Sequence, residues 1–261
     1  MVQRRSYSNC TEVNLECPVE ATIYGYYPSL GGNAFFIAFF ALFGAANLII
    51  GLRYRTYTYA LAMTLAGTAE AIGYVGRVIL HSNPYSETGF DMQICCLIIA
   101  PAFNSAAIYL VLKHVTLCFG ERWSRIKPRL YTYIFITGDL ISLVLQAVGG
   151  AMAATAHDDR HQQDTGDNLM MAGISFQVVT LFFFGVAALD YLWRRRRASE
   201  PLSFEAAGMM SSLKFRCFAL GLTAAFVAVF VRCVYRIVEM AGGWQNPVMQ
   251  NEASFIVLDG W

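Results

Sequence analysis

Several ionisable side chains lie within stretches of the sequence that are otherwise apolar. The stretch Arg232-Cys-Val-Tyr-Arg236-Ile-Val-Glu239 carries three charges, spaced so that they share one face of an α-helix. A second stretch carries Glu70 and Arg77. A charge in hydrocarbon costs from about 2.5 to more than 10 kcal/mol, so it faces a bundle interior and pairs. The pattern predicts inward-facing charges that form acid–base pairs or bind a charged ligand.

The depths of these charges predict which of them pair. Counted from the ends of the apolar stretches, Glu70 and Arg232 lie deep, whereas Arg77 and Glu239 lie near one boundary. If the two helices are neighbours, we expect Glu70 to pair with Arg232. We likewise expect Arg77 to pair with Glu239. Reversing Arg77 and Glu239 singly should then impair folding, and the double exchange should restore it.

Three amides and a further acid add to this polarity. Asp139 and Gln146 are separated so that they share a helix face, Asn104 follows the helix-kinking Pro101, and Gln177 lies in a later apolar stretch. Inward amides often only join helices, through hydrogen bonds of about 1 kcal/mol, and we rank that role ahead of ligand binding for them. For the arginines and glutamates we rank ligand binding first. The candidate ligand-binding residues are Glu70, Arg77, Asn104, Asp139, Gln146, Gln177, Arg232, Arg236, Glu239, Glu252 and Asp259.

The elements that must position these residues are long apolar segments. The chain is 56% hydrophobic and only 14% charged, which is typical of a polytopic membrane protein. Each long segment has about 20 residues or more, enough to cross about 30 Å of hydrocarbon as a helix. We expect an all-α membrane bundle with six full helices and a truncated seventh, forming one domain over 33–261 after a tail at 1–32. The expected helices are 33–52, 57–80, 92–117, 131–155, 169–193, 213–238 and, in part, 252–261.

Basic residues predict the orientation of this bundle. They concentrate in the odd-numbered connections, around 53–55, 113–129 and 194–216, whereas the even-numbered connections, around 81–91 and 156–168, are acidic. Connections rich in lysine and arginine remain in the cytoplasm. The N-terminus is therefore expected outside.

The tail at 1–32 carries two features that depend on that orientation. Asn9-Cys10-Thr11 is an acceptor sequence for N-linked glycosylation, so Asn9 is a candidate glycan site. An outside tail lies in an oxidising compartment, which permits a disulfide between Cys10 and Cys17. Sequence spacing leaves that pairing open.

Several classes of chemistry lack the residues that they need. The histidines fall at helix ends or in loops, and the stretch from His157 to His161 is more simply a solvated loop than a metal site. The sequence contains neither cysteine–histidine zinc spacing nor a phosphate-binding loop. We expect no cofactor, no nucleic-acid partner and no enzymatic activity, although a lipid-modifying enzyme is retained as a third alternative.

Four motifs in order resemble one known family. They are Glu-x-x-Gly-Tyr-x-x-Arg at 70–77, Ala-Pro-x-Phe-x-x-Ala-x-x-Tyr at 100–109, Asp-x-x-Ser-x-x-x-Gln-x-x-Gly-Gly at 139–150 and Arg-x-x-Tyr-Arg-x-x-Glu-x-x-Gly at 232–242, followed by Asn251-Glu252 and Asp259. The sequence resembles the fungal lipid-translocating exporters, seven-helix proteins grouped with the yeast aminocholesterol-resistance protein. The resemblance implies an outside N-terminus, a fungal membrane, usually the plasma membrane, and roles in stress or drug resistance. It also implies links to sphingoid bases, phospholipid asymmetry and porphyrins.

The residues and the resemblance together favour movement of a lipid-like molecule. Our leading hypothesis is that the protein binds and translocates or exports an amphipathic molecule such as a sphingoid base, phospholipid, sterol-like drug or porphyrin. Most of the polar groups belong to the outer half of the bilayer, which predicts a polar cavity there. The carboxylates would hold an amine, and the arginines a phosphate or carboxylate. The alternative is a seven-helix sensor that regulates lipid traffic indirectly. The partners would be membrane lipids and this ligand, and the oligomeric state is left open.

Overall fold

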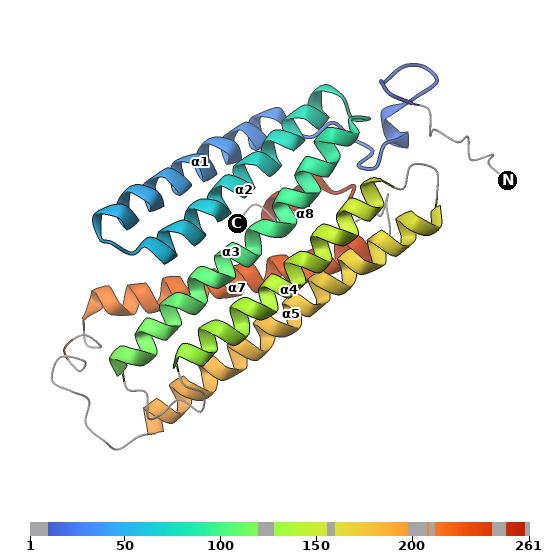
Figure 1. Ribbon diagram of the computed structural model, residues 1–261. Helices are drawn as coiled ribbons and strands as arrows, with labels where there is room; N and C mark the ends of the chain where they lie inside the picture. The colour runs from blue at the N-terminus through green and yellow to red at the C-terminus, as the bar shows by residue number, and fades with distance from the viewer. Residues whose placement is uncertain are drawn as a thin grey trace.

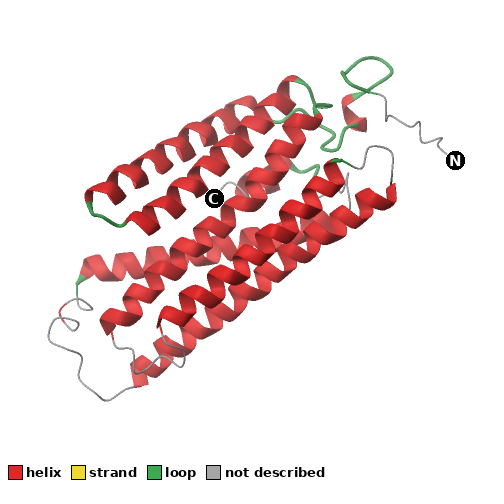
Figure 2. Ribbon diagram, in the orientation of Figure 1, coloured by secondary structure: helices red, strands yellow, loops and turns green. Residues whose placement is uncertain are grey.

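The computed structural model describes residues 10–119, 128–155, 160–197, 208, 212–241 and 249–258. Within these residues the chain forms helices and loops and contains no strand (Figure 2). A short 3-10 helix (Val19–Ala21) precedes the α-helices. These are α1 (Leu30–Arg53), α2 (Tyr57–Ser82), α3 (Glu87–Phe119), α4 (Pro128–Ala154), α5 (Arg160–Arg197), α7 (Leu213–Ala241) and α8 (Glu252–Leu258).

The long helices lie side by side and alternate in direction (Figure 1). Consecutive helices from α1 to α5 pack as antiparallel neighbours, and α7 packs against α3 and α5. One end of the bundle holds Arg53 and the start of α7 at Leu213, and we call it the basic end. The opposite end holds Leu30 and Glu87, and we call it the acidic end. The long axis of the bundle runs between these two ends.

Apolar side chains cover the outside of the bundle, while charged ones are buried in it. Leu42, Phe183 and Leu220 are exposed to 72%, 59% and 71%. By length and composition, five of the described helices are able to cross a membrane, namely α1, α3, α4, α5 and α7. The expected all-helical membrane bundle is therefore confirmed. Helix α2 is 26 residues long, but Glu70 and Arg77 lower its hydropathy, so its crossing remains a prediction, as does the orientation.

The helices extend beyond most of the apolar segments from which they were predicted. Helix α5 begins at Arg160 rather than at 169, because the polar residues 160–168 continue the helix past the apolar segment. Helix α3 begins at Glu87 rather than at 92 for the same reason. The last predicted segment is α8, and Asp259 lies outside the described residues.

The segment before α1 packs onto the acidic end. Its cysteines, Cys10 and Cys17, are joined by a disulfide. The Tyr85 hydroxyl donates to the Pro18 carbonyl over 2.7 Å, which ties the α2–α3 loop to this segment. Tyr24 is only 4% exposed. The expected tail is therefore folded against the bundle from residue 10 onward, while Asn9 lies outside the described residues.

Candidate functional site

A buried ion pair links α2 to α7 near the middle of the bundle. Glu70 is 1% exposed and Arg232 is 3% exposed. Both guanidinium NH groups of Arg232 donate to the Glu70 carboxylate, the second one over 2.8 Å, and Nη2 also donates to the Leu97 carbonyl over 3.3 Å. This bidentate geometry is the strongest that an arginine and a carboxylate form. The pair expected from the depths of the two residues is present.

Arg77 lies closer to the acidic end and contacts three other parts of the chain. Its Nε donates to the Asn33 Oδ1 at the start of α1, and its Nη2 donates to the Tyr26 hydroxyl, each over 3.1 Å. The Glu252 Oε1 atom of α8 lies 3.8 Å from the Arg77 Nη2 atom. The guanidinium also stacks on the Phe255 ring, 3.9 Å from its centroid. Arg77 therefore joins the N-terminal segment, α1 and α8 around α2.

The structure corrects the expected pairing of Arg77 with Glu239. Glu239 instead accepts a hydrogen bond of 2.6 Å from Arg236, three residues earlier on α7. The Phe255 ring lies near both arginines, 3.9 Å from the Arg77 guanidinium and 5.6 Å from that of Arg236. Because α8 inserts this ring between α2 and α7, Arg77 meets Glu252 rather than Glu239.

The two tyrosines beside Arg77 remain neutral hydrogen-bonding groups. Burial raises the pKa of the Tyr24 and Tyr26 hydroxyls, and the nearby Arg77 charge opposes that rise in pKa only in part. Tyr24 also accepts a hydrogen bond of 2.7 Å from Gln93 of α3. The sequence did not predict that Tyr24, Tyr26 and Asn33 belong to the group of residues around Arg77. Asn33 had a usable signal, because it is an amide at the start of an apolar segment.

Three further polar candidates, Asp139, Gln146 and Gln177, lie between α3, α4 and α5. Gln146 donates to Gln177 over 3.0 Å, and both amides are buried. Asp139 lies on the same face of α4 as Gln146 and is 3% exposed, beside the Tyr109 hydroxyl of α3. This group is separate from the α2–α7 ion pair. The structure therefore divides the predicted site residues into two clusters.

A cavity of about 480 Å³ extends from the Glu70–Arg232 pair toward the basic end. Phe39, Phe43 and Phe218 line it and are themselves exposed, so the cavity opens on the side of the bundle between α1, α2 and α7. Most of the lining is apolar, and the polar candidates that reach it are Glu70, Asn104 and Arg232. The charged residues nearer the acidic end mostly contact one another, and Arg77, Arg236 and Glu239 are not among the residues that line this cavity.

A second cavity, of about 410 Å³, lies at the acidic end. Its lining includes the aromatic residues Tyr24 and Phe90 and the carboxylates of Glu87 and Asp91. The sequence indicated both acids only as markers of orientation. Within the described part of the chain, neither cavity brings together three or more side chains that hold metal ions.

The sequence of this chain is similar to a known protein family and to several yeast proteins. Residues 63–261 match the family described as RTA1 like protein. The chain is 30% identical over 238 residues to the sphingoid long-chain base transporter RSB1 of Saccharomyces cerevisiae, covering 81% of this chain and 62% of that one. It is 31% identical over 193 residues to protoporphyrin uptake protein 1 of the same species, covering 73% and 60%. It is 29% identical over 207 residues to protein RTM1, covering 78% and 63%. No solved structure matches the chain.

The family match covers both clusters and most of the lining of the first cavity, while Phe39, Phe40, Phe43 and Tyr59 precede it. It begins at residue 63, so it contains both members of the Glu70–Arg232 pair as well as Asp139. The chain spans about 60% of the length of these relatives. The resemblance seen in the four motifs is confirmed, and the chain belongs to the RTA1-like protein family.

Proposed function

We propose that this protein binds an amphipathic molecule with a long hydrocarbon portion and moves it across the bilayer. The observation that carries the proposal is the cavity of about 480 Å³, which is lined mostly by apolar residues and reaches the Glu70–Arg232 pair at its deep end. Its volume lies in the range of small-molecule binding sites, about 300–1,000 Å³. The apolar wall accommodates a chain, and the ion pair meets the polar head.

The ion pair suits a head group that carries an amine or an acid. Glu70 offers carboxylate oxygens to an ammonium, and Arg232 offers guanidinium donors to a phosphate or a carboxylate. Two relatives are named for a sphingoid long-chain base and for protoporphyrin, and both substances combine a large apolar part with ionisable groups. The proposed ligand class for this chain is therefore a sphingoid base or a similar ionisable amphiphile.

The direction of movement follows from the predicted orientation. With the basic end in the cytoplasm, the cavity opens in the inner half of a plasma membrane. The cavity at the acidic end would then lie on the outer side, with its two carboxylates available to an ammonium. Along α2, the buried residues Tyr74 and Arg77 separate the two cavities. We infer that the ligand passes from the first cavity to the second as this separation opens.

Flipping of a fluorescent sphingoid base in liposomes tests the proposal. Ala225 lines the cavity, whereas its neighbour Ala224 lies on the outer groove of α7. Ala225→Phe should therefore slow flipping about tenfold, equivalent to about 1.4 kcal/mol, whereas Ala224→Phe should leave it unchanged. Equal rates for the two variants would refute the assignment of this cavity, and a wild-type protein that moves no probe would refute transport.

One observation favours the second candidate, a lipid sensor. Glu70 and Arg232 already neutralise each other, so the fold does not require the charge of a ligand. A sensor would bind the same amphiphile in the same cavity without increasing its flipping. Binding of the probe by a wild-type protein that leaves flipping at the background rate would favour this candidate.

A further inference from the structure

Asp139 differs from the other buried acids of the described bundle in having no basic partner. Glu70 and Glu239 each accept a hydrogen bond from an arginine. Asp139 is 3% exposed, and the polar group beside its carboxyl oxygens is the neutral Tyr109 hydroxyl rather than a cation. A carboxylate that is removed from water without a compensating cation is strongly disfavoured, and it binds a proton instead.

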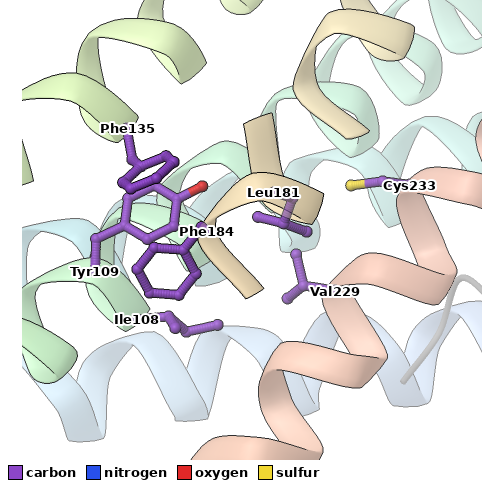
Figure 3. Packing of buried hydrophobic residues seen from close by; sticks show 7 residues of the cluster. All are labelled: Ile108, Tyr109, Phe135, Leu181, Phe184, Val229 and Cys233. Atoms are coloured by element: carbon purple, nitrogen blue, oxygen red, sulfur yellow. The ribbon is translucent and has the colours of Figure 1, made fainter. Parts of the chain in front are cut away.

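The surroundings of Asp139 are mostly apolar. The Tyr109 hydroxyl of α3 lies next to the carboxyl group, and Phe135 and Phe184 pack around the Tyr109 ring at centroid distances of 5.6 and 4.4 Å (Figure 3). The Cys233 thiol of α7, which belongs to the same hydrophobic cluster, also lies near Tyr109. None of these groups carries a positive charge that would stabilise an ionised Asp139.

Helix α5, which packs against this part of α4, adds no charge either. The α5 side chains that contact α4 at Phe135, Gly138 and Gln146 are those of Phe184, Thr180 and Gln177, and none of them ionises. Protonation of Asp139 is therefore set by its own burial and by Tyr109. The site holds a proton rather than a metal, since one carboxyl group beside one phenol offers too few ligands for a metal ion.

Asp139 lies one layer of side chains behind the wall of the cavity. Ile108 and Val229 line the cavity and also belong to the hydrophobic cluster that contains Tyr109 (Figure 3). Cys233 of that cluster directly follows Arg232 on α7. A change of charge at Asp139 therefore acts on the side chains that shape the cavity and on the helix that carries its arginine.

We propose that Asp139 is the proton-binding site that couples movement of the amphiphile to a proton gradient. The proposal rests on the proposed transport function. In the arrangement seen here the carboxyl group holds the proton. Its release leaves a carboxylate and a free proton, and the uncompensated charge behind the cavity wall favours a second arrangement of α3, α4 and α7 that admits water or a cation. Proton occupancy thereby selects between two conformations of the transport path.

Infrared spectroscopy of the protein in lipid nanodiscs measures the proton directly. We expect the C=O band of a protonated carboxyl group at neutral pH, and we expect Asp139→Asn to lose it. Asp190→Asn is the matched control, because Asp190 pairs with Arg194 on the surface of α5 and should not contribute to the band. Tyr109→Phe should retain the band but shift its titration. Absence of the band from the wild-type protein, or its persistence in Asp139→Asn, would overturn the proposal.

Flipping of a labelled sphingoid base under an imposed pH difference tests the coupling. The wild-type rate should depend on the gradient, and the rate of a folded Asp139→Asn variant should not. A wild-type protein that flips the probe at the same rate with and without the gradient overturns the coupling. A wild-type protein that flips nothing refutes the transport function on which the coupling rests, while the infrared band still decides whether Asp139 holds a proton.

Discussion

Buried charged residues join the helices of this bundle, because most of them contact a polar or aromatic partner on another part of the fold. The spacing of residues in the sequence predicts only some of these partners. The pairing of Glu70 with Arg232 is predictable from depth alone, since both residues lie far from the ends of their helices. The partners of Arg77 are not predictable in this way. Asn33, Tyr26 and Phe255 come from other elements, whose positions depend on contacts between parts of the chain far apart in sequence.

Charge reversal tests the buried pair. Glu70→Arg and Arg232→Glu should each destabilise the protein by about 3–5 kcal/mol, because each leaves two like charges buried together. The double exchange should recover most of that loss. Thermal unfolding in detergent, followed by a thiol-reactive dye, measures the change. Arg194→Glu, at the half-exposed pair with Asp190, is the control and should cost no more than about 1 kcal/mol. A double exchange no more stable than the single variants would contradict direct pairing.

Helices α4 and α5 approach each other closely where Gly149 faces Gly166. A Cβ atom on Gly149 of α4 would lie 2.7 Å from the Gly166 carbonyl of α5 and 2.6 Å from the Met170 backbone nitrogen. Small residues at such contacts bring backbones together in membrane bundles, where dispersion replaces the hydrophobic effect. The apolar segments predict that these helices exist, but which glycines make contact depends on rotation about the helix axes, which composition does not encode.

Adjacent glycines of α4 provide a matched test of that packing. Gly149→Ala should destabilise the protein by about 1–3 kcal/mol, because the backbone of α5 has to move. Gly150→Ala should be neutral or stabilising, since its Cβ would lie 3.8 Å from the Cys95 sulfur and alanine favours the helix. Detergent unfolding temperatures of the two variants provide the comparison. Equal losses would show that α4 and α5 do not pack as closely as described.

At the scale of the whole molecule, the bundle places charge inside and apolar surface outside. That arrangement is predictable from composition and from the length of the apolar segments. The folded N-terminal segment is not predictable in the same way. Its contacts, such as the one between Tyr85 and Pro18, join short polar stretches that carry no periodic pattern.

The orientation of the bundle is tested by glycosylation. An outside N-terminus predicts that the protein, produced in yeast, carries a glycan on Asn9. Endoglycosidase treatment should increase its gel mobility, and Asn9→Gln should abolish that change. A cysteine introduced at Ser212, at the basic end, should remain inaccessible to an impermeant maleimide in intact cells. Labelling at that position would contradict the predicted orientation and indicate the opposite one.

The side opening of the first cavity determines which concentration governs its occupancy. Its rim residues, Phe39, Phe43 and Phe218, belong to the exposed apolar surface of α1 and α7, two of the helices that are long and apolar enough to cross a membrane. The proposed ligand would therefore enter from hydrocarbon, and its occupancy would follow its mole fraction in the bilayer rather than its concentration in water. Two amphiphiles with identical contacts but different partition coefficients will show different apparent Kd values. Adding empty lipid vesicles will weaken apparent binding through dilution alone.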